Sequence, residues 1–154
     1  MSEASFGRTA SLQFHVSQED TAIALGSGEL AVLATPRVIA WLEAACVHCL
    51  RLDERQASVG TRVDIEHVKA SGIGARIDVT ATVSYVDGRL IRFDVVAEQS
   101  ASPEVDQTSP DEQARAEQTR ADQVDGVVTR IAHGTMTRVV VDRERFLARL
   151  NPGG

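Results

Sequence analysis

Residues 35–51 read TPRVIAWLEAACVHCLR, and this stretch decides the fold. Thr35 is a favoured N-cap residue and Pro36 is favoured at the first helical position, so we expect a helix from Pro36 to about Arg51. When its residues are placed about 100° apart, the polar side chains form one narrow stripe and the rest of the surface is apolar. A helix that is apolar on nearly all sides is typical of a buried core element.

One acidic residue of this helix lies outside the polar stripe. Glu43 is rotated roughly 80–140° away from the stripe and falls among Ile39, Val47 and Leu50. A carboxylate inside or beside an apolar core seldom occurs without a partner or a purpose, because its desolvation is costly. Glu43 is therefore the first candidate for a functional residue.

The rest of the chain shows mainly the alternation of apolar and polar residues that is typical of β-strands. We expect strands at 12–16, 60–67, 75–86, 89–98 and 127–141, a short buried strand at 30–34, and a last helix at 142–150. Asp87-Gly88 predicts a type I′ hairpin turn. The alternation places His67 and Val63 on the inward face of one strand, and Tyr85 on that of the next. One buried helix with about four antiparallel strands predicts an α+β fold.

The length of 154 residues suits a single domain, 1–154, with a sizeable core. Most of the negative charge lies in one segment, because residues 100–126 hold seven acids and two bases, a net charge of −5 out of −6 for the chain. This segment has almost no large apolar side chain, so it cannot bury enough surface to offset its ordering entropy. We therefore expect a disordered acidic insertion at about 100–126.

Charge and hydropathy argue against nucleic acid and membrane as partners. A net charge of −6, a pI near 5.2 and only six aromatic residues do not suit a surface that binds phosphates and stacks on bases. The longest apolar runs are five residues, whereas a membrane-spanning helix needs about 20. The N-terminal residues have no basic start and no apolar stretch, so we expect a cytoplasmic location.

Cys46, His48 and Cys49 lie close together in the sequence, but they do not make a convincing metal site. A structural zinc ion needs four ligands, and only this one histidine lies near the two cysteines. A redox-active pair would usually lie at a helix N-terminus, whereas these cysteines fall about three turns into the helix. We expect two buried structural cysteines and no metal.

Several blocks of sequence, taken in order, resemble the fluoroacetyl-CoA-thioesterase-like branch of the hot-dog superfamily. The matching blocks are residues 34–36, 42–45, 59–67, 134–138, 141–142 and 145–146. The resemblance covers most of the chain except the first dozen residues and the acidic insertion. It implies a hot-dog fold, in which an antiparallel sheet wraps around one long buried helix.

The resemblance also implies a site and an assembly. The family's catalytic Thr, Glu and His fall on Thr35, Glu43 and His67, and a pocket-lining, substrate-binding glycine falls on Gly60. The substrate would be an acyl-CoA with no further cofactor, and the assembly a homodimer or higher oligomer whose sheets join edge to edge, with sites near the interface. Two features depart from the family: Met136 stands where a histidine is common, and residues 26–30 lack aromatic lid residues. Fluoroacetyl specificity is therefore not carried over.

The chemistry of thioester hydrolysis suits these residues. Glu43 would act as a nucleophile that forms an anhydride or as a general base for water, and His67 would hydrogen-bond Glu43 or the substrate and protonate the leaving thiolate. Each residue also has a structural interpretation. Glu43 would pair with an arginine, His67 would be a hydrogen-bonded core residue, and Thr35 would cap the helix. Gly60 would either donate its main-chain N–H to the oxyanion or simply begin a strand.

The alternatives to hydrolysis are a hydratase and a non-catalytic binding protein. A hot-dog hydratase site resembles an Asp followed by Asn-Pro and a His, and the only asparagine here is Asn151, so that site is absent. The alternative that stays open is a non-catalytic hot-dog protein that binds acyl-CoA. Binding without turnover would favour this alternative.

Overall fold

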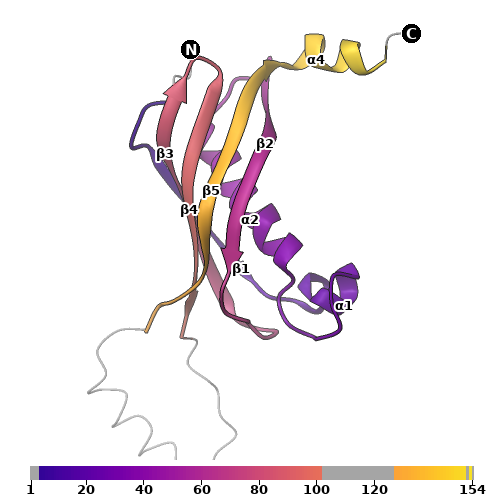
Figure 1. The fold of residues 1–154 in the computed structure, drawn as a ribbon, viewed down its shortest axis with the longest axis vertical. Helices are drawn as coiled ribbons and strands as arrows, with labels where there is room; N and C mark the ends of the chain where they lie inside the picture. Colours follow the sequence, from indigo (N-terminus) through magenta and orange to yellow (C-terminus); the bar gives the residue numbers. More distant parts are fainter. Residues whose placement is uncertain (1–3, 102–126, 152, 154) are drawn as a thin grey trace, which may run out of the picture.

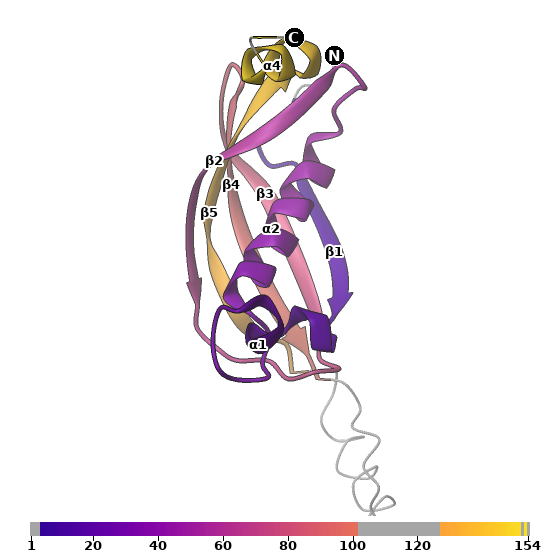
Figure 2. The same cartoon turned by 90° about the vertical axis from the view of Figure 1, so that its right-hand side faces the viewer.

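The computed structural model describes residues 4–101, 127–151 and 153. A five-stranded antiparallel sheet curves around the long helix α2, so the expected α+β architecture is confirmed (Figures 1 and 2). The strand order is β1-β3-β4-β5-β2. The strands are β1 (Thr9–His15), β2 (Gln56–His67), β3 (Arg76–Asp87), β4 (Leu90–Ser100) and β5 (Thr129–Asp142). The helices are α1 (Ala22–Leu25), α2 (Thr35–Leu50), α4 (Arg143–Leu150) and a 3-10 turn, η1 (Gln18–Asp20).

Helix α2 lies across the concave face of the sheet and forms one side of the core (Figure 2). Its buried side chains include Val38, Leu42 and Leu50, and Trp41 stacks on Phe14 of β1 with ring centroids 4.6 Å apart. The expected helix from Pro36 to about Arg51 is thus confirmed within one residue. The predicted helix cap at Thr35 is wrong. The helix begins at Thr35 itself, so Ala34 is the N-cap residue, and no side chain caps the helix.

The central hairpin of β3 and β4 supplies the other side of the core. The inward residues of β4, Ile91 to Ala97 in steps of two, are all buried as expected. On β3 the expected inward face holds as far as Val83, but Tyr85 is 47% exposed. The pairing register shifts between these two residues, and such a bulge turns the following side chains to the other face. The predicted type I′ turn is also wrong. Such a turn needs two central residues with positive φ, and in this hairpin only Gly88 has a positive φ.

Strand β2 is an edge strand that pairs only with β5. Val63, expected on the inward face, is 44% exposed because the sheet ends at this strand. Gly134 of β5 must be glycine, since a Cβ there would overlap the Asp64 carbonyl of β2. Edge strands of twelve residues with exposed apolar side chains are uncommon unless something pairs with them.

Two further expectations concern segments outside the sheet. The predicted strand at 30–34 is wrong: the segment makes only isolated bridges, between Thr21 and Leu33 and between Val32 and Gly72, and Leu30 is 67% exposed. The acidic insertion lies, apart from its first two residues, outside the described residues. In the described part of the chain, no helix is long and apolar enough to cross a membrane.

Candidate functional site

The first polar pair of the site joins the start of α2 to the end of β2. Thr35 Oγ1 and His67 Nδ1 are 2.8 Å apart, so they share a hydrogen bond. His67 Nε2 is buried and makes no well-formed hydrogen bond within the described part of the chain. Burial lowers the pKa of His67, and the main chain of Lys69 opposes this shift in part. The imidazole is therefore neutral at neutral pH and retains one nitrogen for a further partner.

A pocket of about 240 Å³ opens beside this pair. Small and apolar residues make up most of its wall, among them Leu33 and Val68, and Lys69 adds an amine at the rim. Thr35 and His67 lie in the same wall.

The second polar pair lies in the middle of α2. Arg138 Nη1 of β5 donates to Glu43 Oε2 at 2.7 Å. The same guanidinium donates through Nε to Ser58 Oγ at 2.8 Å and through Nη2 to the Ser58 carbonyl at 3.0 Å. The Arg138 side chain is 8% exposed and the Glu43 side chain 37%. The expected carboxylate beside the core is confirmed, and so is the arginine partner that was its structural alternative.

Gly60 provides the space for this ion pair. A Cβ at Gly60 would lie 2.9 Å from Glu43 Oε2 and 3.4 Å from Arg138 Nη1. The carboxylate thus lies against the main chain of the edge strand β2. Arg138 bonds only one of its two oxygens, and Oε1 has no hydrogen-bond donor in the described part of the chain. This oxygen is open to solvent or to a ligand, because the side chain is 37% exposed.

The two pairs do not meet within one chain. Thr35 and Glu43 are eight residues apart on α2, which corresponds to about 12 Å along the helix axis. The His67–Glu43 hydrogen bond considered from the sequence is absent, and the imidazole bonds Thr35 instead. The described chain therefore holds two separate polar pairs, which we call half-sites.

Sequence analysis did not assign a role to Arg138 or to Ser58. A signal was present, because Arg138 follows Met136 by two residues in a strand and therefore shares its inward face. Arg138 and Met136 are both buried in the structure. An arginine on an inward strand face requires a carboxylate partner, and Glu43 was the candidate.

The two cysteines lie in the core next to this pair. Cys46 and Cys49 are buried and unpaired, as expected. Burial raises the pKa of the Cys46 thiol to about 12, so it is not nucleophilic at neutral pH. Among the described residues, no group of three His, Cys, Asp or Glu side chains is placed to hold a metal ion.

Comparisons with known proteins place the chain among thioesterases. The family described as FlK, fluoroacetyl-CoA-specific thioesterase, matches residues 16–105. Among solved structures, a point mutant of the fluoroacetyl-CoA-specific thioesterase FlK is 26% identical, with 97% of each chain covered and a TM-score of 0.71. A hot-dog-like protein from Thermanaerovibrio acidaminovorans is 20% identical, with 97% of this chain and 93% of that chain covered and a TM-score of 0.70.

A thioesterase superfamily member from Thermus thermophilus is 17% identical, with 99% of this chain and 94% of that chain covered and a TM-score of 0.73. Among curated protein sequences, no relative matches. The fold implied by the sequence resemblance is thus confirmed. The chain has a hot-dog fold and belongs to the thioester hydrolase family described as fluoroacetyl-CoA-specific thioesterase.

Proposed function

We propose that this protein is an acyl-CoA thioesterase that hydrolyses a thioester to a free acid and CoA through Thr35, Glu43 and His67. The observation that carries the proposal is the carboxylate of Glu43, which Arg138 fixes through one oxygen while the other oxygen stays free. A carboxylate with one fixed and one free oxygen is suited to act on a water molecule or on a carbonyl carbon.

Glu43 can perform the reaction by two routes. As a general base, Oε1 takes a proton from water while the water oxygen attacks the thioester carbonyl carbon. As a nucleophile, Oε1 attacks that carbon itself, and water then hydrolyses the resulting anhydride. In both routes the C–S bond breaks and the CoA thiolate leaves and is protonated. In both routes, Arg138 and Gly60 hold the carboxylate in place.

Thr35 and His67 would stabilise the charge that develops on the substrate. If the Thr35 hydroxyl donates to Nδ1, the neutral imidazole carries its proton on Nε2, the nitrogen without a partner. This N–H can donate to the thioester oxygen or protonate the thiolate. The partial positive charge at the start of α2 favours an oxyanion in the same place.

A second copy of the chain would bring the half-sites together. Glu43 faces Gly60 on β2, the edge strand at which another sheet can pair. Ile39 lies midway between Thr35 and Glu43, so two α2 helices that run antiparallel about Ile39 would each place Glu43 opposite Thr35 of the other copy. The proposed enzyme is therefore a homodimer, or a higher oligomer built from it, with sites shared across the interface. A cytoplasmic location remains a prediction that cell fractionation tests.

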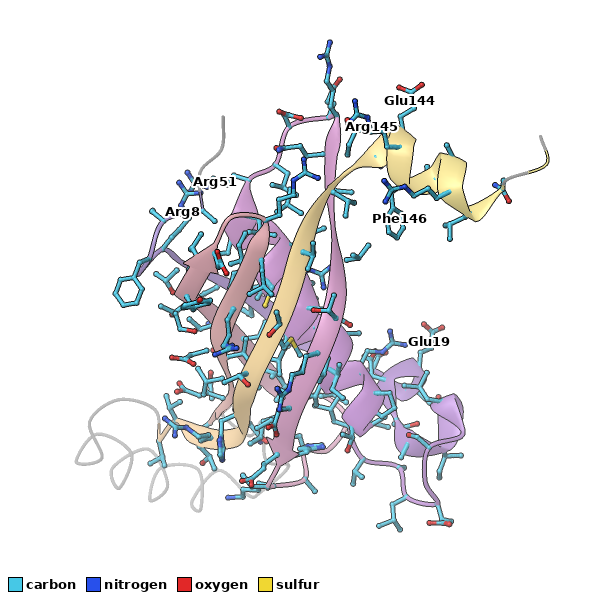
Figure 3. All side chains as sticks on the ribbon, turned by 45° about the horizontal axis from the view of Figure 1, so that its top comes forward. Arg8, Glu19, Arg51, Glu144, Arg145 and Phe146 are labelled. Carbon is cyan, nitrogen blue, oxygen red and sulfur yellow. The ribbon has the colours of Figure 1, made fainter. Side chains whose placement is uncertain are left out.

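The test is a thiol-release assay with acyl-CoA substrates of increasing chain length, fluoroacetyl-CoA included. We expect turnover of at least one short-chain substrate, and Glu43→Gln should lower kcat by a factor of about 10²–10⁴ in a chain that still folds. Its unfolding midpoint should fall, because Arg138 keeps a nearly buried charge without its carboxylate partner. Glu19→Gln is the matched control, because Glu19 projects outward beside α1 (Figure 3). Tight acyl-CoA binding without turnover would contradict the proposal and favour the non-catalytic alternative.

A further inference from the structure

A second cavity opens at the other end of α2. It has a volume of about 500 Å³ and lies between the end of α2, the start of β2 and the first residue of α4. Its polar lining comes from three separate elements: His48 and Arg51 from α2 and its C-cap, Gln56 and Ser58 from β2, and Arg143 from α4. We call this cavity the basic groove.

The basic groove is positively charged in a chain whose net charge is −6. Its lining residues include two arginines, Arg51 and Arg143, and one acidic residue, Asp53. That carboxylate already accepts a hydrogen bond from the Arg55 main chain at 2.9 Å. No ion pair involves either groove arginine in the described part of the chain, and His48 adds a further N–H donor.

The two groove arginines differ in how far the structure fixes them. Arg51 ends α2 in the left-handed conformation, with φ 49° and ψ 52°. Arg143 donates its main-chain N–H to the Arg55 carbonyl at 2.9 Å and a side-chain N–H to the Gln56 carbonyl at 3.4 Å. Arginine side chains suit phosphate, because a guanidinium can bind two phosphate oxygens at once.

The basic groove is continuous with the Glu43 half-site. Ser58 lines the groove and also accepts hydrogen bonds from Arg138, the partner of Glu43. Val47, another lining residue, follows Glu43 by four residues and so lies on the same side of α2, one turn further on. A ligand that reaches Glu43 with one end can therefore lie along α2 with its other end in the groove.

We propose that the basic groove binds the phosphate groups of the CoA part of the substrate, with Arg51 and Arg143 as the binding residues. The proposal rests on the proposed acyl-CoA thioesterase function, because the thioester must reach Glu43 while the phosphorylated nucleotide occupies the groove. It predicts that the enzyme distinguishes acyl-CoA from the same thioester carried on pantetheine alone, which lacks the nucleotide and its phosphates.

The experiment compares KM for acyl-CoA and for the matching acyl-pantetheine in wild type and variants. Arg51→Gln and Arg143→Gln should each raise KM for acyl-CoA about tenfold, as expected for loss of a charge-assisted hydrogen bond, with kcat unchanged. KM for acyl-pantetheine should not change. Arg51→Lys and Arg143→Lys should keep KM for acyl-CoA closer to the wild-type value. Arg149→Gln, on the exposed α4, is the matched control.

Two results would overturn the phosphate subsite. One is a wild-type KM that is equal for the two substrates, and the other is a variant that raises KM for both substrates by the same factor. Calorimetric titration with CoA separates this proposal from the function proposed above. If no thioester is hydrolysed but wild type binds CoA about tenfold more tightly than Arg51→Gln, the subsite stands and the thioesterase proposal fails. If wild type and variants bind CoA equally, the subsite proposal fails whatever the turnover.

Discussion

The two polar pairs along α2 differ in charge, burial and attachment. The pair at the first turn is uncharged at neutral pH: a hydroxyl bonds an imidazole whose other nitrogen is buried and makes no well-formed hydrogen bond among the described residues. The pair in the middle of the helix is an ion pair, in which a nearly buried guanidinium holds a carboxylate that is about one third exposed. One pair is suited to donate a proton or a hydrogen bond, and the other to attack or to activate water.

The proposed site needs both pairs, and a single chain does not bring them together. The helix separates the two pairs by about 12 Å, and a rigid 16-residue helix cannot bring its own first and third turns together. The buried Nε2 of His67 makes no well-formed hydrogen bond in the described part of the chain, which is uncommon for a buried polar atom, whereas the carboxylate of Glu43 is open to solvent. The predictions below alter one pair at a time.

The largest effect is expected when the carboxylate of the ion pair is displaced. Gly60→Ala places a Cβ 2.9 Å from Glu43 Oε2, and the flexible side chain must move. A shift of this size in a reacting group costs about 100-fold in kcat. Stability should change by less than about 1 kcal/mol, because only the end of a side chain is in the way. The assay is thiol release, and Gly72→Ala, where a Cβ meets open space, is the control.

A smaller effect is expected at the neutral pair. Thr35→Val removes the hydrogen bond to His67 Nδ1 and leaves the imidazole free to change its tautomer, so kcat should fall about tenfold. Thr35→Ser should retain most of the activity. Because the structure shows no side-chain cap, both variants should unfold at the wild-type urea midpoint. Loss of activity in Thr35→Ser equal to that in Thr35→Val would show that the methyl group, and not the hydroxyl, is required.

The smallest effect concerns the pH dependence of stability. Burial lowers the pKa of His67 in the native state below its unfolded value near 6.5, so the unfolded chain binds more protons in the window just below that pH. The stabilisation is present above pH 6.5 and is lost as the pH falls towards the native pKa. Urea unfolding between about pH 5 and pH 7.5 should therefore show a free energy of unfolding that rises with pH. His67→Gln should flatten this rise, and an unchanged slope would contradict the assigned pKa direction.

Periodicity was sufficient to predict the elements that build the core. The apolar surface of residues 35–51 and the alternation in β3 and β4 depend on burial alone, which side-chain hydropathy reports directly. Tyr85 was misplaced because a bulge changes the face without changing the pattern. The short strand at 30–34 failed because Leu33 is buried by tertiary contacts without any ladder of hydrogen bonds.

The site was predictable in its residues and not in its connections. Glu43 stood out because an acid in an apolar surface needs an explanation, whereas its partner Arg138 is distant in sequence and adjacent only through the β5–β2 pairing. Thr35 suited a cap by type and position, yet its hydroxyl bonds His67 from another element. Local sequence patterns indicate which structural role suits each residue. The register of the sheet determines which residues that are distant in sequence come into contact.

The central claim is that Glu43 of one copy works with Thr35 and His67 of another. Mixed dimers test it most directly: Glu43→Gln and His67→Ala chains with different affinity tags are co-expressed, and the doubly tagged dimer is purified. A shared site predicts one intact site of the two in each mixed dimer, and thus about half of wild-type thiol release, although each parent homodimer is inactive. A mixed dimer as inactive as its parents, or an active monomer, would contradict the account.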